Sequence, residues 1–214
     1  MTEQLLKLIA DKYPLTETDV GEFAEVKASG MKFHIRAFRA EGLGIVSEMR
    51  AKGMLGLMKM DSVIVDPFLV DLPLYSYDRI RAMGNDVLIA ELYDTLLTPF
   101  DESKLNEVKA KFASLPERDP GKHWYDDIKL KSSISKKGKK KNSASVDALA
   151  LKHFETYLAS PAPQADEQRK REKARYYVNG LLEKGGPSTD AFVKAIGKEK
   201  TKELFEKYLF GTEN

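Results

Sequence analysis

The sequence predicts an α+β protein, a three-layer α/β/α sandwich with a central antiparallel sheet. Residues 32–93 contain several runs typical of β-strands, joined by short turns and with no helix between them, which is the order of an antiparallel meander. Helical patterns stand on both sides of this block, at residues 2–13 and from Val146 onward. No internal repeat and no long linker divides the chain, so we expect a single domain over residues 1–214.

The elements follow from local patterns. A first helix is expected to take Thr2 as its cap and to end before Pro14. Turn residues then separate five expected strands, at residues 32–38, 44–49, 57–65, 74–80 and 87–93. After Pro99 the pattern is irregular up to a lysine-rich loop. Helices are expected from there to the end, at residues 146–158, 166–182, 188–197 and 204–209.

Composition excludes several kinds of chemistry. The chain has no cysteine, which rules out disulfides, zinc–thiolate sites, protein-bound iron–sulfur clusters and cysteine nucleophiles. His34, His123 and His153 show no metal-ligand spacing, so each is expected to be structural or exposed, and no metal is expected. No stretch reaches 18 consecutive apolar residues, and we expect a cytoplasmic protein with no membrane partner.

The positive charge is local. The formal net charge is +2, but seven of the 35 lysines and arginines lie between Lys129 and Lys141, and the rest of the chain carries a net charge of −5. The run Lys136–Lys141 is flanked by Ser and Gly rather than by aromatic residues, which argues against a nucleic-acid partner. It indicates a solvated loop or a docking site for an acidic partner.

Familiar cofactor and catalytic motifs are absent. The segment Gly42–Ser47 begins like a dinucleotide-binding fingerprint but has Ser47 where the third glycine belongs, and no βαβ unit surrounds it. The chain also has no phosphate-binding P-loop, no serine-hydrolase elbow and no H-E-x-x-H pair. If the protein carries out redox chemistry, its electrons must come from outside.

Two aspartates stand in a predicted hairpin. If Asp66 faces Pro73 across the turn, Asp61 lies directly opposite Asp78. Two carboxylates so placed repel each other, which raises the pKa of one of them and makes it a candidate general acid. In the alternative interpretation Asp78 forms a salt bridge with Arg79 or Arg81, and Asp61 is an exposed strand residue. A one-residue bulge would also break the register.

The segment Leu72–Ile80, read Leu-Pro-Leu-Tyr-Ser-Tyr-Asp-Arg-Ile, is followed by a second strand that ends in Glu-Leu-Tyr-Asp at residues 91–94. Together with Trp124–Ile128 and the closing Tyr208–Phe210, it resembles the ferredoxin-dependent bilin reductases, and this similarity spans most of the chain. The resemblance implies an antiparallel sheet between helical layers, with a bilin held between the sheet and the C-terminal helices.

The resemblance also implies roles for single residues. Asp78 matches the central proton donor of the family. Asp61 stands where enzymes that make phycocyanobilin have His and those that make phycoerythrobilin typically have Asn. Glu48 corresponds to a family glutamate if the intervening turn differs by one residue, which makes it, with Asp78 and Asp61, a predicted catalytic residue of the bilin site. Gly186 stands where a second acid is common, which suggests a two-electron reaction or a variant that uses Asp61.

We therefore expect a monomeric ferredoxin-dependent oxidoreductase that reduces biliverdin or a dihydrobiliverdin. It would bind no cofactor and would take electrons from reduced ferredoxin, which Lys136, Lys137 and Lys139 would dock. Two alternatives stay open. One is a bilin- or haem-binding protein of the same fold with little or no turnover. The other is a small nucleic-acid-binding protein that uses the lysine-rich loop.

Overall fold

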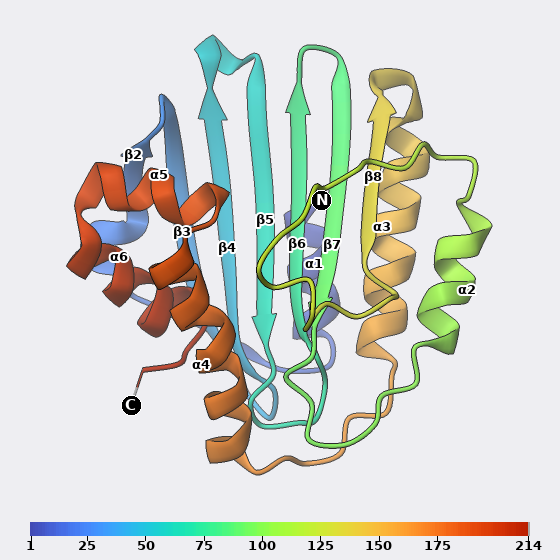
Figure 1. The fold of residues 1–214 in the computed structure, drawn as a ribbon, viewed down its shortest axis with the longest axis vertical. Helices are drawn as coiled ribbons and strands as arrows, with labels where there is room; N and C mark the ends of the chain where they lie inside the picture. Colours follow the sequence, from blue (N-terminus) through green and yellow to red (C-terminus); the bar gives the residue numbers. More distant parts are fainter. Residues whose placement is uncertain (214) are drawn as a thin grey trace.

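An eight-stranded antiparallel sheet forms the centre of the computed structural model, which describes residues 1–213 (Figure 1). The strand order is β1-β3-β4-β5-β6-β7-β8, and β2 pairs with β3 beside β1. The strands are β1 (Leu15–Thr18), β2 (Glu25–Ala28), β3 (Met31–Ala40), β4 (Gly44–Gly53), β5 (Met58–Asp66), β6 (Leu74–Ala82), β7 (Asn85–Tyr93) and β8 (Ile134–Lys139). The predicted antiparallel meander is confirmed.

Helices cover both faces of this sheet. The α-helices are α1 (Thr2–Ala10), α2 (Ser103–Lys111), α3 (Ser143–Leu158), α4 (Glu167–Lys184), α5 (Pro187–Ile196) and α6 (Lys198–Glu203). Short 3₁₀ turns are η1 (Gly21–Ala24), η2 (Met54–Gly56) and η3 (Lys140–Asn142), and η4 (Leu204–Leu209) is a π-helical turn. Within residues 1–213, no helix combines the length and apolar character that a membrane crossing requires.

Two hydrophobic cores separate the layers. Helices α1, α2 and α3 pack on one face through residues such as Leu5, Val108 and Phe154. Helices α4 and α5 and the turn η4 pack on the other face through residues such as Val178 and Phe192. In Figure 1, α1 lies behind the sheet and α4, α5 and α6 lie in front of it. The predicted three-layer α/β/α sandwich is therefore confirmed.

The start of α1 differs from the prediction. Thr2 is not the cap but the first helical residue, and Met1 precedes it without a side-chain capping bond. Thr2 is buried, so its side chain belongs to the packed face of the helix rather than to its exposed end.

The lysine-rich segment is the main correction to the predicted elements. It forms strand β8 and the turn η3 instead of a solvated loop. Burial alternates along β8, because Lys136 points inward while Lys137 and Lys139 are exposed. The ammonium of Lys136 donates to the carbonyl of Leu115 at 3.0 Å and to the carboxylate of Glu117 at 2.5 Å. A lysine can be buried when its charge is paired. The inward position of Lys136 therefore does not stand out as apolar in the sequence, and the alternation of the strand could not be recognised.

Candidate active site

A cavity of about 1050 Å³, counted with its open mouth, lies between the sheet and the elements in front of it. Its floor comes from β4, β5, β6 and β7, including Met49, Ile64, Asp78, Ile80, Ile89 and Glu91. Its roof comes from the segment between α2 and β8 and from the C-terminal helices, including Arg118, His123, Tyr125, Tyr177, Gly186 and Phe205. Figure 1 shows that segment crossing in front of the sheet. A mostly apolar lining with a few polar groups is typical of a site for an organic ligand.

Asp78 is the acid at the floor of this cavity. It is half-buried on β6, where the hydroxyl of the buried Ser62 on β5 donates a hydrogen bond to its Oδ1. Burial raises the pKa of Asp78 from its ordinary 3.8 to about 6; the Ser62 bond opposes the rise and the charge of Glu91 adds to it. At pH 7 roughly 10% of such a carboxyl is protonated, against roughly 0.1% for an ordinary aspartate. Asp78 is thus suited to donate a proton.

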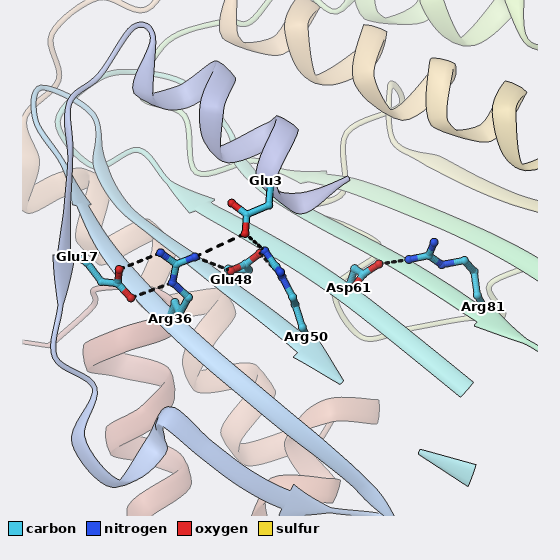
Figure 2. Close-up of polar contacts among 7 residues, drawn as sticks. All are labelled: Glu3, Glu17, Arg36, Glu48, Arg50, Asp61 and Arg81. Carbon is cyan, nitrogen blue, oxygen red and sulfur yellow. Dashed lines mark hydrogen bonds and ion pairs between the residues drawn. The ribbon is translucent and has the colours of Figure 1, made fainter. Parts of the chain in front are cut away.

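Asp61 does not meet Asp78. In the β5–β6 ladder Ser62 pairs with Asp78, whereas Asp61 pairs with Arg79, one residue away from the predicted register. Because neighbouring residues on a strand point to opposite faces, this shift moves Asp61 away from the cavity. There it forms an ion pair with Arg81 (Figure 2).

The loop between β5 and β6 explains the shifted register. It is not a tight turn, because distant parts of the chain hold it. The Asp71 carboxylate accepts hydrogen bonds from the backbone N–H groups of Leu97 and Thr98, both at 2.9 Å. The N–H of Asp71 donates to the carbonyl of Pro163 at 2.8 Å. Turn geometry could therefore not set the pairing from local sequence.

Glu48 also lies on the other face. It is buried on β4, opposite Arg36 of β3 and Val63 of β5. Figure 2 shows it beneath α1, where its carboxylate lies 2.6 Å from Arg50 Nη2 and 3.4 Å from Arg36 Nη1. The predicted role of Glu48 in the cavity is wrong, since its neighbour Met49 is the residue that lines the cavity.

Glu91 is the second acid of the cavity, and no role was predicted for it. It lies on β7 opposite Ser76, which makes it a diagonal neighbour of Asp78 on the same face. Its carboxylate accepts a hydrogen bond from the Tyr93 hydroxyl at 2.6 Å and lies 3.6 Å from Lys129 Nζ. The alternation Ile89, Glu91, Tyr93 was the available signal, because it places all three side chains on one face.

Position 186, where the resemblance places a further acid, has no carboxyl group. Gly186 lines the cavity in extended backbone directly before α5. Asp190, in the first turn of α5, is exposed and does not line the cavity. Among the residues that the structure describes, no group of three metal-ligating side chains occurs.

The histidines fall in three different environments. His34 is exposed, as expected, and His153 is buried. The ring of His153 forms hydrogen bonds with the hydroxyl of Tyr75 at 2.9 Å and the carbonyl of Ser132 at 3.0 Å, which is a structural role. His123 instead lines the cavity roof. Nothing in the sequence marked it, because it stands alone in an irregular segment.

Trp124 fastens this roof segment to α4. Its indole N–H donates to the carbonyl of Gly185 at 3.1 Å. A Cβ at Gly180 would come within 2.1 Å of the indole ring, so only glycine leaves room for it. The neighbouring residues His123 and Tyr125 are thereby held over the cavity.

The three predicted docking lysines separate. Lys136 is buried in its contact with Glu117 and is not available to a partner. Lys137 and Lys139 are exposed and pair with Val87 and Asn85 of β7. Cross-strand partners share a face, so both lysines stand on the cavity side of the sheet, at its β8 edge.

Comparison by sequence with family models and with curated proteins found no match. By structure the chain is similar to the crystal structure of phytochromobilin synthase from tomato in complex with biliverdin. The TM-score is 0.74 at 14% sequence identity, and the match covers 99% of this chain and 82% of that chain. The antiparallel sheet and the helices of this chain thus have the fold of a known bilin-binding enzyme.

Proposed function

We propose that the protein is a ferredoxin-dependent bilin reductase acting on biliverdin or a dihydrobiliverdin. The observation that carries the proposal is Asp78, an acid with a raised pKa at the floor of a largely apolar cavity. The sequence resemblance, the shared fold and the biliverdin bound to the tomato protein support it.

In the proposed reaction the chain binds and orients the bilin and supplies protons. Electrons arrive singly from reduced ferredoxin, and the conjugated substrate itself holds the unpaired electron, so no resident cofactor is required. Asp78 protonates the reduced pigment. Its carboxylate then accepts the Ser62 hydrogen bond, which stabilises the charge left behind. The aromatic roof residues Tyr125, Tyr177 and Phe205 exclude water and pack on the planar rings.

Ferredoxins are acidic, and the exposed lysines of β8 offer a surface of opposite charge. Lys137 and Lys139 lie on the cavity side of the sheet. A donor bound there would stand beside the cavity, and its docking would depend on salt.

A second candidate is a bilin- or haem-binding protein with little or no turnover. Gly186 favours it, because the cavity has no carboxyl group at that position. The third hypothesis, nucleic-acid binding by a basic loop, loses its main support, because the lysines form a strand with Lys136 buried.

One experiment separates these candidates. Purified protein is mixed anaerobically with biliverdin, and absorption spectra are recorded before and after addition of ferredoxin and its reducing system. A reductase shows a bound-pigment spectrum that converts to a new product spectrum only when reduced ferredoxin is present. A binding protein keeps its pigment unchanged. Absence of any spectral change on mixing would contradict both.

A further inference from the structure

We propose that His123 delivers the second proton of the reduction, a task for which the cavity has no carboxyl group at Gly186. This inference rests on the proposed function. It gives this histidine a role beyond the structural or exposed one expected from the sequence, because the side chain lines the cavity roof above the face that carries Asp78.

The other proton-bearing groups of the cavity are poorly suited to this task. Burial raises the pKa of Tyr93, Tyr125 and Tyr177 above its ordinary value, so these hydroxyls hold their protons tightly. Arg118 keeps its proton at any physiological pH.

Glu91 is also less suited, because its carboxylate is already bound by two neighbours. The Tyr93 hydroxyl donates to it at 2.6 Å, and the Lys129 ammonium lies 3.6 Å away. Asp78 and His123 are then the groups of this lining with suitable chemistry, because an imidazole both gives and takes protons near neutral pH.

The ring of His123 is held in place on one side and accessible on the other. It stacks on Tyr125 with a centroid separation of 4.9 Å and an interplanar angle of 6°. Its Nδ1 is buried and has no hydrogen-bond partner in the part of the chain that the structure describes, and the side chain as a whole is 25% exposed. The exposed part of the ring therefore lies away from Nδ1.

Asp126 stands behind this ring. Its Oδ1 lies 3.8 Å from His123 Nδ1, too far for a hydrogen bond but close enough for an ion pair with an imidazolium. The carboxylate is fixed by Lys129 Nζ at 2.6 Å and by the backbone N–H of His123 at 2.9 Å.

The step balances as a two-electron reduction. Two molecules of reduced ferredoxin, each a one-electron iron–sulfur donor, supply two electrons to one bilin. Asp78 supplies one proton and the His123 imidazolium the other. One carbon–carbon π bond of the conjugated system is lost and two C–H bonds form. The Asp78 carboxylate and the neutral His123 ring then regain protons from water at the cavity mouth.

The test uses His123→Phe, which keeps a flat ring on Tyr125 but carries no proton, and His123→Ala, which vacates the site. His34→Phe, an exposed histidine outside the cavity, is the matched control. Biliverdin binding is measured first by absorption, and a single turnover with reduced ferredoxin follows. We expect both His123 variants to bind pigment, to accumulate a partly reduced radical, and to form product about 100-fold more slowly. Added imidazole should restore the His123→Ala variant, whereas the control should match the parent.

Three results would overturn the inference. They are product formation by His123→Phe at the parent rate, no response of His123→Ala to imidazole, and loss of pigment binding in both variants, which would make His123 a binding residue. Failure of the proposed function would look different, because the parent protein itself would then leave bound biliverdin unreduced.

Discussion

Ser62 and Asp78 are direct cross-strand neighbours on β5 and β6, and the serine hydroxyl donates a hydrogen bond to the aspartate. This hydrogen bond opposes the effect of burial on the pKa of Asp78. Burial raises the pKa of Asp78 to about 6, and Ser62 keeps it from rising further. Asp61 stands one residue along β5 on the opposite face, so the two aspartates that the sequence paired have separate surroundings.

Asp78→Asn should abolish proton donation while the cavity still binds pigment. We expect product formation to fall by at least about 100-fold, with a partly reduced species accumulating. Asp61→Asn is the matched control, because its carboxylate binds Arg81 away from the cavity. Rapid-scan absorption under anaerobic conditions measures both variants. An altered product spectrum in Asp61→Asn together with normal turnover in Asp78→Asn would contradict the assignment.

Ser62→Ala and Glu91→Gln should shift the pH dependence of the reaction in opposite directions. Ser62 lowers the pKa of Asp78, so its loss should raise that pKa and extend activity to higher pH. Glu91 raises the same pKa, so Glu91→Gln should move the profile to lower pH. The rate of product formation, measured from pH 5 to 9 for the parent and both variants, gives the direction of each shift. Shifts of the same sign would show that the two residues do not act through Asp78.

Glu48→Gln should cost stability without changing the chemistry. The buried carboxylate lies between Arg36 and Arg50, and its loss leaves two guanidinium groups with one partner fewer. We expect unfolding free energy to fall by about 1–3 kcal/mol, since both arginines stay partly solvated. Urea denaturation gives the value. The folded variant should keep the parent turnover, and a specific loss of turnover would return Glu48 to the site.

Asp66 should make stability depend on pH. Within residues 1–213, neither oxygen of its buried carboxyl has a hydrogen-bond partner, and burial raises its pKa to about 7. The folded state therefore binds this proton more tightly than the unfolded chain does. The contribution of this proton to the free energy of unfolding is fully present below pH 3.8. It decreases as the pH rises from 3.8 and is lost above about 7.

Asp66→Asn removes this dependence. Its Tm should exceed that of the parent most at pH 8, by roughly 2–6 °C, should exceed it by less near pH 5, and should match it only below pH 3.8. Thermal melts at several pH values provide the measurement. Curves for parent and variant that run parallel across this range would exclude the effect.

The exposed lysines of β8 should control electron delivery. Replacing Lys137 and Lys139 by Ser should lower the ferredoxin-dependent rate at low salt by about tenfold and flatten its decline with added salt. Reduction by a small neutral reductant is the control and should not change. Lys136→Ser should instead lower stability, because that side chain is buried against Glu117. An unchanged salt response in the double variant would place docking elsewhere.

The sheet could be predicted from the sequence because apolar and polar residues alternate in strands such as Met31–Ala40, and this alternation follows the burial of their side chains. It was insufficient where distant contacts decide. The pairing of β5 with β6 depends on a loop that Asp71 ties to Leu97 and Thr98, and a shift of one residue exchanged Asp61 for Ser62. Helix α2 was missed because it buries only Leu105 and Val108.

The same limit applies to the site. Asp78 could be identified because it stands in an extended motif on a strand. His123 could not, because its irregular segment has no periodicity and is positioned by Trp124, which is seated on a helix more than fifty residues away in the chain. The prediction that Lys136 is exposed was wrong, because the sequence does not distinguish a buried, ion-paired lysine from a solvated one.

Gly180 has an influence beyond its own position. In an exposed helix, glycine lowers helix stability by about 1 kcal/mol relative to alanine. In α4, however, the absence of a side chain at Gly180 leaves the space that the Trp124 indole occupies. A single methyl group at position 180 would lift the tryptophan and, with it, the adjoining histidine. The placement of His123 over the cavity thus depends on Gly180, a residue of α4 that does not itself line the cavity.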